Sequence, residues 1–177
     1  MKRVLSLLGA CTVLMLVLCA AGTAQTKSSG TSFAGTWVLD KSKSELPDMM
    51  HNIESITWVI TQDDKQISRE SKMEEGGQGA GRGMGMGNNR PLTLQLDGSE
   101  TVSESPRGKS TSKVKWSGDN KILEVNTISN LNMQGNQFTM TTTEHWELTE
   151  GGKVLKVHQS RVIPMGQVET ILVFNKK

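Results

Sequence analysis

The feature that most constrains this chain is an alternation of apolar and polar residues with a period of two, repeated along most of its length. In Ser55–Gln62, for example, Ile56, Trp58 and Ile60 occupy every second position. This period is that of a strand with one buried face, and it excludes an amphipathic helix. The pattern predicts strands over residues 36–40, 55–62, 65–73, 91–96, 100–105, 109–116, 122–129, 137–148, 153–163 and 167–175.

Turn-forming residues separate most of these runs. Asp63-Asp64, Asp97-Gly98, Pro106-Arg107-Gly108, Ser117–Asn120, Glu150-Gly151-Gly152 and Pro164-Met165-Gly166 stand between successive strands. Asp97-Gly98 is a strong signal for a two-residue hairpin. Sequential hairpins predict an all-β fold, a single antiparallel up-and-down β-barrel of roughly eight to ten strands, because closure removes exposed strand edges. A two-sheet sandwich is the competing architecture.

The first residues have the three parts of a secretory signal peptide. Lys2 and Arg3 precede an apolar run, Val4–Leu18, and small residues lead up to a cleavage position after Ala24. Residues 1–24 are therefore expected to be removed and the protein to be exported, periplasmic or secreted. A membrane anchor is disfavoured because the apolar run is short for a bilayer. Lipid attachment at Cys19 is the other alternative.

Removal of the signal peptide changes the composition of the chain. Both cysteines leave with it, so the mature protein has neither a disulfide nor a thiol nucleophile. Of 20 Lys and Arg residues 18 remain, against 18 Asp and Glu, and this zero net charge predicts no nucleic-acid partner. Residues 25–32 are expected to form a flexible linker and 33–177 the barrel domain. Within it, the glycine-rich stretch 76–89 is expected to be a disordered loop, with a functional loop as the alternative.

The opening and closing strands resemble those of a known superfamily. Phe33–Leu39 carries Gly35-x-Trp37, which resembles the first strand of the calycins, the superfamily of lipocalins and fatty-acid-binding proteins. Ile171–Lys177 resembles the last strand of fatty-acid-binding proteins and of bacterial exported lipocalin-like domains. The resemblance implies a barrel that encloses a small hydrophobic or amphiphilic ligand. Gly35 and Trp37 are expected to be structural, with Trp37 closing one end of the barrel; its alternative role is to stack on a ligand.

The resemblance does not carry over a ligand. Fatty-acid-binding proteins hold a carboxylate with Arg-x-Tyr on the last strand, and this chain has Leu172-Val173-Phe174 at the matching positions. The two-helix lid that follows the first strand in those proteins is also not supported, because residues 41–52 form a short and polar segment.

Four polar residues fall on faces that are otherwise apolar: Arg69, Glu144, Gln159 and Arg161. Buried charges are costly unless they are paired. Glu144 is therefore expected to pair with Arg69 or Arg161, or one arginine remains free to hold an anionic head group in the barrel interior. Counted outward from the turn at Glu150-Gly151, Glu144 is expected roughly opposite Lys156 or Val157. A shift of one residue in strand phase would place all four outside.

Other chemistries are poorly supported by the sequence. The histidines His51, His145 and His158 form no zinc motif, and no nucleophile or phosphate-loop motif is present, which predicts a protein that is not an enzyme and has no cofactor. Copper binding through Met49-Met50 and Met84-Gly85-Met86 is a lesser alternative. Non-enzymatic binding or carriage of a small molecule is the leading hypothesis. A protein-interaction or inhibitor module with a filled barrel is its competitor, and Trp58, Trp116 and Trp146 are expected in the core in both cases.

Overall fold

The computed structural model describes residues 30–50, 52–75, 91–133 and 135–177, and it confirms the predicted all-β class. Every run predicted from the alternation forms a strand, with ends shifted by a few residues. The strands are β1 (Gly35–Leu39), β2 (Ile53–Gln62), β3 (Gln66–Glu75), β4 (Leu92–Gln95), β5 (Thr101–Ser105), β6 (Gly108–Trp116), β7 (Ile122–Met133), β8 (Asn136–Thr149), β9 (Val154–Ile163) and β10 (Gly166–Lys176). Two short 3-10 helices, η1 (Asp48–Met50) and η2 (Glu150–Gly152), join them.

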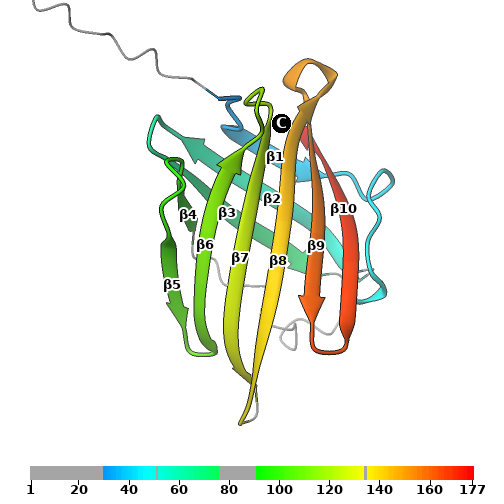
Figure 1. Cartoon of the computed structure of the whole chain (residues 1–177). Coiled ribbons are helices and arrows are strands. Elements are labelled where there is room, and N and C mark those ends of the chain that lie inside the picture. The colour runs from blue at the N-terminus through cyan, green and yellow to red at the C-terminus, as the bar shows by residue number, and fades with distance from the viewer. Residues whose placement is uncertain (1–29, 51, 76–90, 134) are drawn as a thin grey trace, which may run out of the picture.

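The strands form one antiparallel sheet that curls into a nearly closed barrel. Their order is β4-β3-β2-β1-β10-β9-β8-β7-β6-β5, so β5 to β10 form one wall and β1 to β4 the other (Figure 1). The first and last strands of the chain, β1 and β10, pair with each other in the middle of the sheet, where Trp37 lies opposite Lys176 and Leu39 opposite Phe174. The up-and-down barrel is therefore confirmed over the competing sandwich.

The barrel is not sealed between β4 and β5, which are the two edges of the sheet. The prediction of a hairpin at Asp97-Gly98 is wrong. The turn itself forms, since Gly98 donates its N–H to the carbonyl of Gln95 at 3.3 Å. Asp97 then accepts a hydrogen bond from the N–H of Ser99 at 2.8 Å, which fixes the chain beyond the turn, and β5 pairs with β6 instead of β4.

One half of the barrel interior is filled by a large apolar core. Phe33 stacks on Trp116 and meets Trp146 edge to face, both at 5.9 Å between ring centroids. Trp58 lies 4.3 Å from the ring centroid of Phe174. Aliphatic residues from six strands complete this core: Ile60, Ile67, Leu94, Val114, Leu123, Val125, Leu155 and Val157. Trp146, Leu155 and Val157 of this core lie close to the β8–β9 turn, which is at the top of Figure 1.

Gly35 and Trp37 lie at this filled end. Trp37 is fully buried and donates its indole N–H to the carbonyl oxygen of Phe33 at 2.9 Å. Gly35 has a φ of +146°, which residues with a side chain rarely adopt, and a Cβ there would lie 2.9 Å from the Lys176 side chain. The structural roles of both residues stay a prediction, which the Trp37 variants described below test.

Several predictions concern residues outside the described part of the chain. The signal peptide 1–24 and the loop 76–89 lie there entirely, as does most of the linker 25–32. At the end of that linker, Thr31 donates its backbone N–H to the carbonyl of Asn120 at 3.0 Å. Among the described ranges, no helix has the length and apolar character needed to cross a bilayer.

Candidate functional site

The other half of the barrel interior is hollow. It contains a cavity of about 310 Å³, at the lower end of the ~300–1,000 Å³ that is usual for small-molecule sites. Seven of its lining residues are apolar, and the other twelve are polar or charged. The apolar residues are Met50, Ile56, Trp58, Met73, Leu92, Met140 and Leu172; the polar and charged ones are Arg69, Ser71, Ser103, Ser110, Ser112, Thr127, Ser129, Thr142, Glu144, Gln159, Arg161 and Thr170.

An ion pair forms the boundary between the filled and hollow halves. Arg69 on β3 donates from Nη1 to Oε2 of Glu144 on β8 at 2.9 Å, and the two side chains are 17% and 8% exposed. The guanidinium of Arg69 also lies 4.3 Å from the ring centroid of Trp58 and 5.2 Å from that of Trp146. Arg69 is thus satisfied by a carboxylate and by the aromatic layer beneath it.

Glu144 accepts three hydrogen bonds. Besides Arg69, the Trp146 indole N–H donates to Oε2 and the Gln159 amide donates to Oε1, both at 2.8 Å. Burial by itself raises the pKa of Glu144, but the nearby Arg69 charge and these hydrogen bonds outweigh it, and the pKa lies below its ordinary value. Glu144 is therefore a carboxylate at neutral pH, and its charge is committed to Arg69.

Arg161 on β9 is differently placed. It donates from Nη2 to the side-chain oxygen of Gln159 at 3.0 Å, so it reaches Glu144 only through that amide. Its Nε is buried and has no hydrogen-bond partner among the described residues. With Arg69 neutralised by Glu144, Arg161 leaves the cavity wall with one uncompensated positive charge.

The structure corrects the expected register between β8 and β9. Glu144 lies opposite Gln159, and Thr142 lies opposite Arg161, whereas the sequence count placed Glu144 opposite Lys156 or Val157. The difference arises because Lys153 belongs to the turn together with η2, and pairing starts at Thr149 opposite Val154. Gln159 bridges Glu144 and Arg161, since its amide donates to Glu144 and its carbonyl oxygen accepts from Arg161.

All four predicted interior residues line the cavity, and Glu144 pairs with Arg69 as one of the alternatives expects. Their role in binding a ligand stays a prediction. The sequence reasoning missed the hydroxyl side chains on the same wall. The strand period already indicated them, because Ser110 and Ser112 lie on the same face of β6 as Val114 and Trp116. Serine and threonine occur on both faces of strands, however, so their presence on one face does not by itself indicate a binding site.

The hydroxyl groups of β6 and β7 pair across the strands. Ser110 and Ser129 have their oxygens 2.8 Å apart, and Ser112 and Thr127 have theirs 2.9 Å apart. Ser112 and Ser129 are almost fully buried, at 2% and 6% exposure. A hydroxyl has one donor and two acceptor sites, so each pair retains hydrogen-bonding capacity for a ligand or for water.

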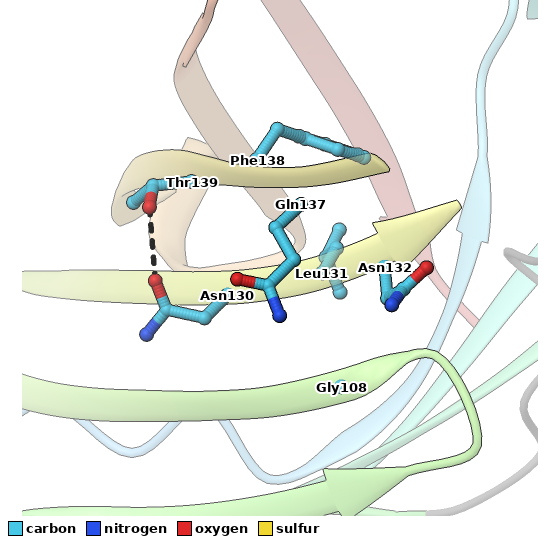
Figure 2. Close-up of a pocket in the computed structure, with 7 residues that line it drawn as sticks. All are labelled: Gly108, Asn130, Leu131, Asn132, Gln137, Phe138 and Thr139. Carbon is cyan, nitrogen blue, oxygen red and sulfur yellow. Dashed lines mark hydrogen bonds between the residues drawn. The ribbon is translucent and has the colours of Figure 1, made fainter. Parts of the chain in front are cut away.

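A second hollow, of about 420 Å³, lies beside β6, β7 and β8 near the β7–β8 turn (Figure 2). Asn130 and Gln137 lie side by side there, and Asn130 accepts a hydrogen bond from the Thr139 hydroxyl at 2.9 Å. The side chains of Asn130, Asn132, Gln137 and Thr139 are exposed, and no charged residue lines this hollow. It lacks the charged side chains that make the barrel interior a candidate site.

Metal chemistry finds little support among the described residues. Residues 30–50, 52–75, 91–133 and 135–177 contain no group of three or more His, Cys, Asp or Glu side chains that could hold a metal ion. Of the methionines considered for copper, Met50 is buried and lines the cavity. His51, Met84 and Met86 lie outside the described residues.

Comparisons with known proteins do not identify a family. No protein-family model matches this chain, and no curated protein matches it. A solved structure of zebrafish ileal bile acid-binding protein, complexed with cholic acid, is similar over 83% of this chain and 100% of its own length, with a TM-score of 0.49 and 14% sequence identity. The predicted membership of the bacterial exported lipocalin-like domains stays a prediction.

Proposed function

We propose that this protein binds and carries a small molecule with a single negative charge in the hollow half of its barrel, and that it is not an enzyme. The observation that carries the proposal is Arg161 on the wall of a cavity, where its buried Nε has no hydrogen-bond partner in the part of the chain that the structure describes. Arg161 is partly buried, its Nη2 bonds only to a neutral amide, and it faces the cavity without a counterion among the described residues. A carboxylate, sulfonate or phosphate ester would supply both the opposite charge and the hydrogen bonds.

Charge balance within the cavity sets the number of negative charges. Among the described residues that line the cavity, Arg69 and Arg161 contribute two positive charges and Glu144 one negative charge, and the others are neutral. Because Glu144 is ionised and hydrogen-bonded to Arg69, only one positive charge remains for a ligand. A monoanion therefore neutralises the interior, whereas a dianion would leave a buried negative charge without a partner.

The first test is a fluorescence titration with the anionic amphiphile 1-anilinonaphthalene-8-sulfonate. Arg161→Met keeps most of the side-chain volume and removes the charge, so we expect binding of the probe to weaken about tenfold or more while the thermal melt stays cooperative. Lys156→Met is the matched control, because it removes the same charge from an exposed position on the outer face of β9. Equal binding by the wild type and both variants would refute the proposal.

Arg69→Met should behave differently from Arg161→Met. Its loss leaves the carboxylate of Glu144 buried without its ion-pair partner, so the main effect should be a lower melting temperature. A variant that melts like the wild type but no longer binds the probe would assign the anion to Arg69 instead of Arg161.

We also propose that the protein is exported, with residues 1–24 removed. The support is the order of basic, apolar and small residues at the start of the sequence. Intact mass spectrometry of the protein recovered outside the cytoplasm should show a chain that begins after Ala24 and contains no cysteine. A mass that includes Cys19 with an attached lipid would contradict soluble export.

A further inference from the structure

One row of polar side chains crosses the inner wall of the hollow half. In adjacent strands, Thr101 of β5 lies opposite Ser112 of β6, and Ser112 opposite Thr127 of β7. Thr127 in turn lies opposite Thr142 of β8, and Thr142 opposite Arg161 of β9. Residues directly opposite each other in antiparallel strands point to the same face of the sheet, so four hydroxyl groups lead across the wall to one guanidinium.

The two ends of this row are unsatisfied. Among the described residues, the only buried side-chain polar atoms without a hydrogen-bond partner are Oγ1 of Thr101 and Nε of Arg161. Thr142, next to Arg161, lines the cavity, and its hydroxyl has no hydrogen bond to another described residue. Only the middle pair, Ser112 and Thr127, satisfy each other, at 2.9 Å.

An alkyl ligand would be poorly matched to this wall. Eight of the lining residues carry hydroxyl groups, whereas binding sites for apolar ligands have a few polar groups in a largely apolar lining. A hydrocarbon placed against these hydroxyls would displace water and give no hydrogen bonds in return, which is unfavourable for each group left without a partner. Ligand hydroxyl groups would replace those of water.

From this row we infer that the ligand is a hydroxylated organic monoanion, of the chemical class of a sugar acid, and not an alkyl-chain acid. Its acidic group contacts Arg161, and its hydroxyl groups lie along Thr142, Thr127 and Ser112. The cavity of about 310 Å³ accommodates a ligand of one or two small rings. This inference rests on the proposed function and names the ligand class for the same site.

Three probes of similar size separate the contributions of charge and hydroxyl groups. D-glucuronate has a six-membered ring with hydroxyl groups and one carboxylate. Cyclohexanecarboxylate has the same ring size and the same charge but no hydroxyl groups. D-glucose has the hydroxyl groups and no charge. Isothermal titration calorimetry on the full mature chain should give an affinity for glucuronate about tenfold or more above that of either other probe. Higher affinity for cyclohexanecarboxylate than for glucuronate would overturn the inference.

Thr142→Val gives the matched variant, because valine has nearly the shape of threonine and only the hydroxyl is lost. We expect this variant to lose several-fold in affinity for glucuronate and to bind cyclohexanecarboxylate unchanged or more tightly. Thr143→Val, on the outer face of the same strand, should change neither affinity. An unchanged preference for glucuronate in Thr142→Val would overturn the assignment of the hydroxyl row.

The outcome also distinguishes this inference from the proposed function. If Arg161→Met weakens binding of the anionic fluorescent probe but cyclohexanecarboxylate displaces that probe better than glucuronate does, the cavity binds monoanions and only the ligand class inferred here is wrong. If Arg161→Met leaves binding of the probe unchanged, the proposed function fails and the ligand class fails with it.

Discussion

Glu144 lies where the filled and hollow halves of the barrel interior meet. Its carboxylate accepts hydrogen bonds from Arg69 on β3, from Trp146 on the same strand and from Gln159 on β9. The side-chain oxygen of Gln159 accepts a hydrogen bond from Arg161 and so orients its guanidinium, which has no counterion among the described residues. A carboxylate at this position therefore neutralises one arginine and positions the other, which links the stability of the fold to the proposed binding site.

The depressed pKa of Glu144 predicts how stability depends on pH. The folded-state pKa lies below the unfolded value of about 4.3, so the unfolded chain takes up the proton first as the pH falls. The stabilisation from Glu144 is thus complete above that value and is lost as the pH decreases through the folded-state pKa. Asp40, Asp97, Asp119 and Glu169 also have lowered pKa values and act in the same direction.

Glu144→Gln isolates the contribution of this residue. The amide leaves Arg69 as a buried charge without its counterion, so the free energy of unfolding at pH 7 should fall by about 3–5 kcal/mol. Below pH 5 the stability of the variant should depend less steeply on pH than that of the wild type. Urea denaturation between pH 7 and pH 3 measures both effects, and parallel pH profiles would show that Glu144 is not the titrating group.

Trp37 should stabilise the filled end of the barrel without taking part in binding. Its ring is fully buried, and its indole N–H bonds to Phe33. Trp37→Ala should lower the free energy of unfolding by about 3–5 kcal/mol, as deletions of large buried aromatics do. Trp37→Phe, which loses mainly the hydrogen bond and part of the ring, should cost less. A loss below about 1 kcal/mol together with abolished binding of the anionic probe would assign Trp37 to the ligand instead.

At the scale of the elements, local sequence patterns predict where the strands are, but they do not determine which strands pair with each other. Each strand shows its own alternation with a period of two in the sequence. For this reason the ten strands could be predicted, and so could the inward orientation of Arg69, Glu144, Gln159 and Arg161. The Asp97-Gly98 turn shows the limit. A turn sequence determines the turn, but whether β5 pairs with β4 or β6 is decided by contacts of whole strands.

The candidate site shows the same limit. Arg69 and Glu144 are separated by 75 positions, so which of the two arginines receives the carboxylate depends on how the sheet closes. The row from Thr101 to Arg161 is likewise a product of four successive registers. No single strand contains the pattern, and a register shift at any turn would break the row; at η2 the observed register differs from the expected one by two or three residues.

The break between β4 and β5 predicts uneven protection of backbone amides. β5 pairs on one side only, with β6, whereas β7 pairs on both sides, with β6 and β8. In hydrogen exchange followed by NMR, alternate amides of β5 should therefore exchange rapidly, and successive amides of β7 should all exchange slowly. Protection along β5 equal to that along β7 would mean that the gap is closed in solution.

On the scale of the whole molecule, the two halves of the barrel interior differ in what they contain. The filled half holds the buried aromatic and aliphatic residues, and the hollow half holds the hydroxyl groups and the uncompensated charge. Hydrophobic burial is the main favourable contribution to folding, so stability should come mostly from the filled half. The hollow half can then keep a polar wall, because the strands that build it extend from the filled half as continuous ribbons (Figure 1).

The same substitution in the two halves tests this division. Leu155 on β9 is fully buried in the filled half, whereas Leu131 on β7 is partly exposed and lies beyond Ser129 toward the other end of the barrel, where it lines the second hollow. Leu155→Ala should lower the free energy of unfolding by about 2–5 kcal/mol, and Leu131→Ala by about 1 kcal/mol or less, because only the first leaves a cavity in close-packed surroundings. Urea denaturation of both variants gives the two values. Equal losses would show that the end of the barrel around Leu131 is packed as closely as the aromatic core, which would contradict the division of stability between the two halves.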